Sequence, residues 1–174
     1  MTRMIKLAWL LAGAGVIAAA LASAQARPVL VFNPSESVPR GFYVRAPGQP
    51  VLGDYVIVRA ANAAPSEAAA RDFDDPTDRF IKRIAALAGS TICASGNQVV
   101  IDGQRIITRR ETNSLGHPLP TWSGCRTLAE GEVLLLGDTP DSFDGRYWGP
   151  ISVSDIDGPW RRLGSRHRSF LTRS

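Results

Sequence analysis

The hydrophobic and polar positions divide the chain into one long apolar run and a series of short alternating segments. The apolar run extends from Leu7 to Ala24 and contains no charge. Alternation over about four to eight residues, bounded by Gly, Pro or Asp, is typical of β-strands. Such strands are predicted at Val29–Phe32, Gly41–Arg45, Asp54–Ala60, Phe80–Leu87, Gly131–Leu136 and Pro159–Leu163, with a hairpin at Gln98–Arg109 that turns at Asp102-Gly103. The pattern therefore predicts a mainly β, antiparallel domain.

Little else in the pattern is regular. We expect a short helix at Ser66–Phe73, with Ser66 as its N-cap. Thr112–Gly124 is polar, contains two prolines and is predicted to be a loop, and Ile151–Gly158 has no clear period. The length of 174 residues suits one domain. Because the apolar run precedes all the predicted strands, we divide the chain into an N-terminal segment at 1–27 and a folded domain at 28–174.

The first segment has the features of an export signal. Arg3 and Lys6 precede an apolar run of 18 residues, which is close to the lower limit for crossing a bilayer. The positive flank should stay in the cytoplasm, so the rest of the chain would be exported. Ala22-Ser23-Ala24 is a small-x-small pattern that a signal peptidase can cut. We expect a periplasmic domain, either anchored in the inner membrane or released after cleavage.

Composition narrows the classes of partner. Hydrophobic content of 44% and charged content of 21% are ordinary for a folded domain. The net charge of +4 owes much to a basic C-terminal stretch, which either contacts anionic lipid or is a solvated terminus. Its residues are Arg161, Arg162, Arg166, His167, Arg168 and Arg173. Because no helix-turn-helix and no interleaved aromatic pattern is present, a nucleic-acid partner is not predicted.

Both cysteines, Cys93 and Cys125, lie in the exported part. An oxidising compartment favours a disulfide between them, which would contribute roughly 3–4 kcal/mol; two buried free thiols are the alternative. A metal site is not predicted, because there is no CxxC and neither His117 nor His167 has ligand-like spacing to the cysteines. No cofactor is predicted either.

Candidate chemistry begins in the segment Asn33–Tyr43. It carries Ser35 and Ser37 between residues that restrict or free the backbone, namely Pro34, Pro39 and Gly41. Such a loop can hold a serine oxygen outside regular structure, where a substrate reaches it. A plain surface turn with solvated serines is the alternative.

Lys82 is out of place in an apolar strand. In the strand at Phe80–Leu87 it shares a face with Phe80 and Ile84, so we expect partial desolvation. Desolvation lowers the pKa of a lysine, and only the neutral amine can act as a base. A lysine that snorkels from a strand edge to water is the alternative.

Three separated blocks resemble, in order, those of the type I signal peptidases, which use a serine nucleophile and a lysine base. Pro34–Pro39 is similar to the family's P-S-x-S-M-x-P box, with Ser37 at the nucleophile position. Phe80–Ser90 is similar to Y-I-K-R-x-x-G-x-P-G-D, with Lys82 as its lysine. Gly137-Asp138 followed by Asp144–Gly149 resembles G-D-N-x-x-x-S-x-D-S-R-x-x-G, one residue shorter here. The resemblance implies a signal-peptidase-like β domain related to that of LexA.

Within that family the chain most resembles the conjugative-transfer signal peptidases of the TraF type. Their S-x-P-x-G-x-Y pattern matches Ser37–Tyr43, and Lys82–Gly89 is followed closely by a cysteine as in that branch. The resemblance implies maturation of a conjugative pilin precursor at the inner membrane, within a conjugative secretion apparatus, and in some members cyclisation of the trimmed pilin. The chain departs from housekeeping enzymes in having one hydrophobic segment, Ala88-Gly89-Ser90 in place of Pro-Gly-Asp, Pro140 in place of arginine, and no large insertion.

The resemblance also implies roles. Ser37 would attack the scissile carbonyl, neutral Lys82 would accept its proton, and the Ser37 N–H with the Ser35 hydroxyl would meet the oxyanion. Ser142 would hold the lysine amine. Asp144 and Arg146 would support the site as a pair across a turn, or form only a weak surface ion pair.

Three other functions compete with this interpretation. One is a general signal peptidase, and another is a non-catalytic periplasmic scaffold of a conjugative secretion apparatus. The third is a self-cleaving regulator with the same Ser–Lys dyad. That class needs a DNA-binding module and no export signal, and the sequence has the opposite features.

Overall fold

The structure is a computed structural model that describes residues 28–70, 78–113 and 115–164. The N-terminal apolar run, its cleavage pattern and most of the basic C-terminal stretch lie outside these ranges. Within them, no helix has the length and apolar character needed to cross a membrane.

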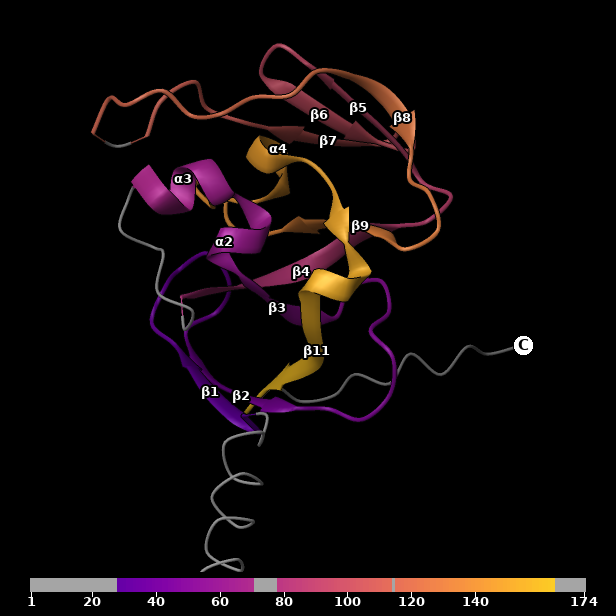
Figure 1. Ribbon diagram of the computed structural model, residues 1–174. Coiled ribbons are helices and arrows are strands. Elements are labelled where there is room, and N and C mark those ends of the chain that lie inside the picture. The colour runs from indigo at the N-terminus through magenta and orange to yellow at the C-terminus, as the bar shows by residue number, and fades with distance from the viewer. Residues whose placement is uncertain (1–27, 71–77, 114, 165–174) are drawn as a thin grey trace, which may run out of the picture.

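The larger sheet has seven antiparallel strands in the order β1-β2-β11-β3-β4-β9-β10 (Figure 1). The strands are β1 (Leu30–Asn33), β2 (Gly41–Arg45), β3 (Tyr55–Arg59), β4 (Arg79–Leu87), β9 (Glu132–Leu136), β10 (Ile151–Ser152) and β11 (Ile156–Arg162). The turn from β1 to β2 carries both candidate serines. β4, which carries Lys82, lies between β3 and β9 near the middle of this sheet.

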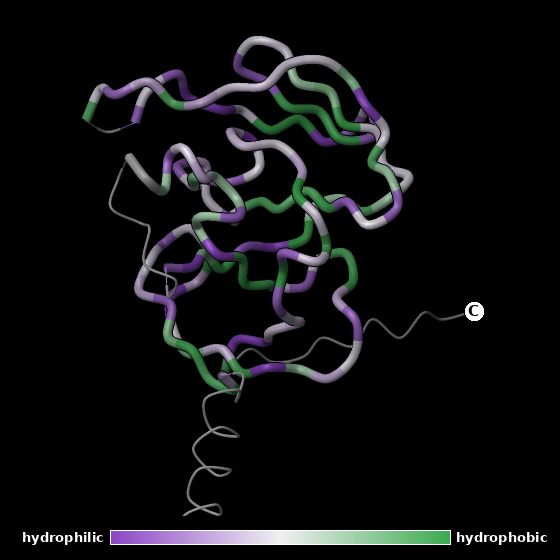
Figure 2. The backbone as a smooth tube through the Cα atoms, in the orientation of Figure 1, coloured by the Kyte–Doolittle hydropathy of each residue, from purple (hydrophilic) through white to green (hydrophobic). Residues whose placement is uncertain are grey.

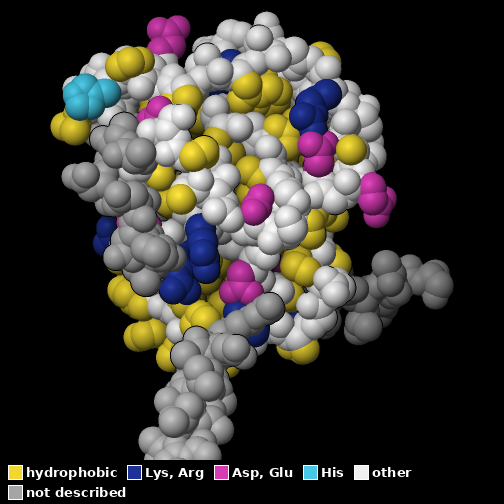
Figure 3. All heavy atoms as spheres, viewed as in Figure 1, with side chains coloured by type: hydrophobic (Ala, Val, Ile, Leu, Met, Phe, Trp, Pro, Cys, Tyr) yellow, Lys and Arg dark blue, Asp and Glu magenta, His cyan; other side chains and the backbone are white. Residues whose placement is uncertain are grey.

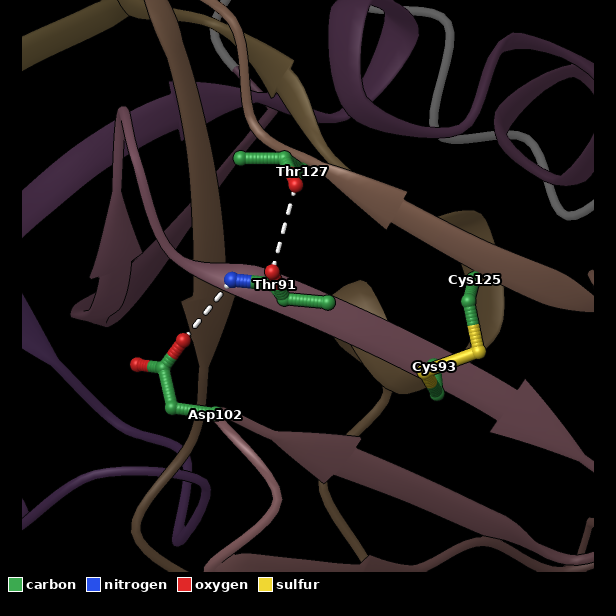
Figure 4. Close-up of a disulfide and its surroundings, with 5 residues drawn as sticks. All are labelled: Thr91, Cys93, Asp102, Cys125 and Thr127. Carbon is green, nitrogen blue, oxygen red and sulfur yellow. Dashed lines mark hydrogen bonds between the residues drawn. A yellow bond between two sulfur atoms is a disulfide. The ribbon is translucent and has the colours of Figure 1, made fainter.

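The smaller sheet has four strands in the order β7-β6-β5-β8 and lies above the larger one in Figure 1. Its strands are β5 (Thr91–Ser95), β6 (Gln98–Ile101), β7 (Arg105–Thr108) and β8 (Gly124–Thr127). Cys93 and Cys125 are directly opposite each other on β5 and β8 and form a disulfide. Figure 4 shows this bond on the same strand pair as the hydrogen bond between the Thr91 and Thr127 hydroxyls.

Successive side chains of β9 point to opposite faces of the sheet, so this strand contributes to two hydrophobic cores. Leu134 and Leu136 pack with the hydrophobic residues of the smaller sheet, whereas Val133 and Leu135 pack on the other face of the larger sheet. A third cluster joins β2, β3, β4 and β11 around Tyr43 and Trp160. In Figure 2 the hydrophobic colour accordingly follows the central strands. Packing in these cores holds β4 and β9 rigidly, together with the residues on β4 and in the loop that follows β9.

The helices are short. They are α2 (Ala60–Ala63), α3 (Pro65–Ala70), α4 (Gly145–Trp148) and one turn of 3-10 helix, η1 (Val153–Asp155). α4 begins after Asp144, whose side chain accepts a hydrogen bond from the Arg146 N–H. This N-cap brings the last predicted sequence block directly against β9, with which α4 is in contact.

The predicted mainly β, antiparallel domain is confirmed, as are the disulfide and most of the strands. β5, β8, β10, α2, α4 and η1 were missed. Ser66 is not an N-cap, because the helix begins at Pro65, a residue favoured at the first helical position; residues 71–73 of the predicted helix lie outside the described ranges. The last strand begins at Ile156 rather than Pro159, and Pro159 is tolerated because it lies where the pairing register shifts.

Candidate active site

The turn between β1 and β2 holds Ser37 at the edge of a groove. Val38 is fully buried and anchors the turn from below, and the Tyr43 hydroxyl donates to the Pro39 carbonyl at 2.7 Å. Ser37 itself is partly exposed, and its Oγ lies 3.0 Å from the Ser35 Oγ. The turn is therefore an ordered loop that presents two hydroxyl groups side by side.

Lys82 lies on β4, on the face predicted from the sequence, and is only 2% exposed. Its Nζ donates a hydrogen bond of 2.9 Å to the Ser142 Oγ and lies 5.5 Å from the centre of the Phe80 ring. The alternative of a lysine that snorkels to water is therefore wrong. The amine is held inside the protein by a neutral hydroxyl.

Burial controls the protonation of this amine. Desolvation lowers the pKa of Lys82 from 10.5 to about 8, against the opposing attraction of the Asp144 carboxylate and with a smaller lowering by Arg146. A lysine with that pKa is neutral in about one molecule in ten at pH 7, compared with fewer than about one in a thousand for an ordinary lysine. Lys82 can thus accept a proton near neutral pH.

Gly137, directly after β9, brings the serine turn and the Ser142 loop together. The neighbouring Asp138 N–H donates to the Ser37 carbonyl at 2.6 Å. A Cβ at position 137 would lie 2.1 Å from the Ser142 Oγ and 2.7 Å from the Ser37 carbonyl oxygen. Only glycine fits this approach, which fixes the Ser37 backbone relative to Ser142.

Asp144 and Arg146 form a buried ion pair, with the Arg146 Nε 2.8 Å from the Asp144 Oδ1. The Asp144 carboxylate also accepts from the Gly137 N–H at 2.7 Å. Arg146 donates in turn to the Pro140 carbonyl at 2.7 Å and to the Thr139 carbonyl at 3.1 Å. The alternative of a weak surface pair is therefore wrong, because both side chains are buried and together brace the loop that carries Ser142.

These contacts surround a groove of about 530 Å³. Its lining residues are Ser35, Glu36, Ser37, Phe80, Lys82, Thr139, Pro140, Asp141, Ser142 and Phe143. Four of the predicted site residues thus meet in one groove, while Asp144 and Arg146 lie behind its lining. Cys93 and Cys125 are on the smaller sheet and line no part of it.

Sequence reasoning missed a network beside the groove. Arg83 donates to the Asp138 carboxylate at 2.8 Å, and the Tyr55 hydroxyl donates to the same carboxylate at 2.8 Å. Burial of Asp138 opposes its charged form, but the hydrogen bonds from Arg83 and Tyr55 hold its pKa below the usual range. Arg83 and Asp138 each lie within a block that resembles the family, and this position was the available signal. Asn33 was also missed, although an Asn at the end of a strand is a common turn former.

Comparisons with known proteins place the chain in a family. The sequence profile described as "Signal peptidase, peptidase S26" matches residues 1–162. Two proteins named "Plasmid transfer protein TraF", both from Escherichia coli, are similar to the chain. One is 29% identical over 82% of this chain and 86% of its own length, and the other 31% identical over 86% and 85%. A "Signal peptidase I" from Leptolyngbya laminosa is 29% identical over 66% of this chain and 56% of its own length. The chain therefore belongs to the peptidase S26 family of signal peptidases.

Proposed function

We propose that the protein is a membrane-associated serine endopeptidase with a Ser37–Lys82 dyad, and that it matures a conjugative pilin precursor. One observation carries the proposal: a buried lysine with a lowered pKa lines the same groove as a partly exposed serine. A serine needs a base to become nucleophilic at neutral pH, and a neutral lysine can be that base.

The proposed reaction begins when Lys82 accepts the Ser37 hydroxyl proton and the Ser37 Oγ attacks the scissile carbonyl. The resulting oxyanion receives hydrogen bonds from the Ser37 N–H and the Ser35 hydroxyl. Lys82 then gives its proton to the leaving amine, and the amide bond breaks. The part of the substrate on the N-terminal side of that bond remains attached to Ser37 as an ester.

Release of the ester needs a second nucleophile, which Lys82 deprotonates in the same way. Water gives a linear trimmed product. A neutral amine of the trimmed chain itself gives a ring. In either case Lys82 passes the proton that it has taken to the departing Ser37 Oγ, and the free serine is regenerated. Ser142 holds the Lys82 amine through both steps, and the buried pair of Asp144 and Arg146 keeps the Ser142 loop in place.

The relatives named "Plasmid transfer protein TraF", which the chain matches along most of their length, support a role in plasmid transfer, and a pilin precursor is the substrate that we propose for that role. General processing of exported proteins is the second candidate, favoured by the similarity to a signal peptidase I. A non-catalytic scaffold is disfavoured by the intact set of groups in the groove. The conjugative secretion apparatus that delivers the pilin is the proposed partner, and no nucleic acid is required.

We place the catalytic domain in the periplasm, at the inner membrane. Some of the exposed hydrophobic side chains support this location, because they lie on or beside the hairpin that carries the serine turn, although others, such as Leu52, Ile106 and Leu115, are exposed elsewhere. Those on or beside the hairpin are Val29, Leu30, Phe32 and Phe42, of which Phe32 and Phe42 pack together at 5.0 Å. Figure 3 shows hydrophobic side chains gathered in the lower part of the molecule, where Figure 1 places β1 and β2. A hairpin resting on lipid would hold the groove at the depth of a membrane-bound substrate.

The test is processing of a conjugative pilin precursor by membranes that carry the full chain. Wild type, Ser37→Ala and Lys82→Ala are compared, with Ser154→Ala as an exposed serine control. We expect processing by wild type and the control only. A product one water lighter than the linear trimmed peptide identifies cyclisation. Normal processing by Ser37→Ala contradicts the proposal, and processing of unrelated exported precursors at the same rate favours the general peptidase.

A further inference from the structure

Asn33, the last residue of β1, is buried next to the serine turn, and its side chain makes five hydrogen bonds there. Its Nδ2 donates to the carbonyls of Ser35 at 2.9 Å, Val38 at 3.1 Å and Pro39 at 3.3 Å. Its Oδ1 accepts from the Ser35 N–H at 3.2 Å and from the Ser35 hydroxyl at 3.0 Å. One side chain therefore ties together both ends of the turn.

These partners fix which way the amide of Asn33 points. Three carbonyls surround one end of the amide, and only an NH₂ group can face them. The oxygen must then face Ser35, so the Ser35 hydroxyl donates a hydrogen bond to the Asn33 Oδ1. The Ser35 Oγ, 3.0 Å from the Ser37 Oγ, is left as an acceptor for the Ser37 proton. The three residues form a hydrogen-bond chain with a defined direction.

We infer that Asn33 is a positioning residue for the reaction, which acts by holding Ser35 and the backbone around Ser37 in place. The inference rests on the proposed roles of Ser37 as nucleophile and Ser35 as oxyanion donor. When the Ser37 hydroxyl turns toward Lys82, the Ser35 hydroxyl exchanges Asn33 for the oxyanion. Asn33 Oδ1 keeps the Ser35 N–H, so this exchange leaves no buried acceptor without a donor.

The test is a double-mutant cycle on the full chain in detergent micelles, with the purified pilin precursor as substrate. The variants are Asn33→Ala, Ser35→Ala and both together. Asn62→Ala is the matched control, because Asn62 is exposed and donates to Asp155, outside the groove lining. Melting temperatures establish that each variant is folded at the assay temperature. Ser37→Ala reports separately on the proposed nucleophile.

We expect Asn33→Ala to lower kcat roughly 10- to 100-fold with KM nearly unchanged, and Ser35→Ala to lower kcat roughly 100- to 1,000-fold. Because Asn33 acts through Ser35, the two effects should not simply multiply. The kcat of the double variant should be at least about 5-fold higher than the value expected from multiplying the two single effects. The control should keep wild-type kinetics.

Two results overturn the inference alone: a folded Asn33→Ala with kcat within about 3-fold of wild type while Ser35→Ala is impaired, or effects that simply multiply. Activity retained by Ser37→Ala overturns the proposed function and the inference together.

A second variant separates orientation from simple loss of packing. Asn33→Asp has almost the same shape, but its carboxylate would face the three carbonyls that Nδ2 faces now. Burial against those oxygens should raise the pKa of the introduced carboxyl, and the protonated carboxyl restores one donor. The ratio of variant to wild-type kcat should therefore fall at least about 10-fold as pH rises from about 5 to 9. A ratio that stays constant over this range, with the variant folded throughout, contradicts the inference.

Discussion

Lys82 and Ser142 are 60 residues apart in the sequence, yet the Lys82 Nζ donates a hydrogen bond of 2.9 Å to the Ser142 Oγ inside the protein. The bond joins the middle of β4 to the loop that follows β9. It gives the buried amine a neutral partner that leaves the amine's lone pair available once the proton is lost. This is the arrangement that a lysine base requires.

Replacing Ser142 with alanine should release the amine from this position. We expect Ser142→Ala to lower kcat roughly 10- to 100-fold, because small displacements of a reacting group have effects of this size. KM should change little, since the backbone that lines the groove is retained. Steady-state kinetics on the pilin precursor measure both constants. Kinetics equal to those of wild type would show that the hydrogen bond has no part in the reaction.

The rate should depend on pH in a way set by Lys82. Only the neutral amine accepts a proton, and its pKa is lowered to about 8 by burial. The value of kcat/KM should therefore rise with pH and level off above about pH 8, rather than continue to rise toward 10.5. A pH profile of kcat/KM for the pilin precursor tests this. A basic limb that keeps rising past pH 9 would mean that the free protein does not hold Lys82 in a desolvated site.

The lowered pKa also predicts an effect on stability. A lysine with a lower pKa in the folded than in the unfolded chain binds fewer protons when folded, so the free energy of unfolding rises with pH between about 8 and 10.5. Below pH 8 the buried charge costs roughly 3 kcal/mol, from the difference between the two pKa values.

Lys82→Met should therefore be inactive but more stable than wild type at pH 7, by roughly 1–3 kcal/mol after the loss of the bond to Ser142. Denaturant unfolding at pH 7 and at pH 10 measures the difference, which should shrink at the higher pH. Titration of the Tyr43 and Tyr55 hydroxyls at high pH changes the stability of wild type and variant alike. It therefore cancels in the stability difference between the two proteins. A variant that is less stable at pH 7 would contradict the assignment.

The pair of Asp144 and Arg146 should contribute to stability far more than a surface pair. Asp144→Asn leaves Arg146 buried without its counter-charge, which should cost roughly 3–5 kcal/mol. Asp141→Asn is the control, since it breaks an exposed ion pair with Arg110 and should cost less than about 1 kcal/mol. Thermal unfolding of the two variants side by side gives the comparison. Equal losses of stability in the two variants would show that the buried pair contributes no more than the exposed pair.

Local sequence was enough to predict some of this site. A Pro- and Gly-rich turn that carries Ser35 and Ser37, and Lys82 on an apolar strand face, follow from patterns within a few residues. The resemblance singled out Ser37 as the nucleophile and Lys82 as its base. The resemblance supplied Ser142, Asp144 and Arg146, because no local pattern indicates contacts across 60 residues. The Asp138 network and Asn33 depend on strand pairing and on the exact path of a turn, which the sequence does not specify.

The same distinction applies to the fold. β9 and β4 were predictable because their apolar residues face packed cores. β8 was not, since all four of its residues are exposed and it is held by pairing with β5 and by the disulfide. α4 has only four residues and depends on the buried side chain of Asp144, so its start is set by tertiary contacts rather than by helix propensity.

The central claim is that Ser37, with Lys82 as its base, forms a covalent intermediate with the substrate. The most direct measurement is acid quenching of the full chain during turnover of the pilin precursor, followed by proteolysis and mass spectrometry. The account predicts an ester on Ser37 carrying the part of the substrate N-terminal to the cleaved bond, and no ester in Lys82→Ala. Turnover with the ester on another residue, or the same amount of ester in Lys82→Ala, would contradict it.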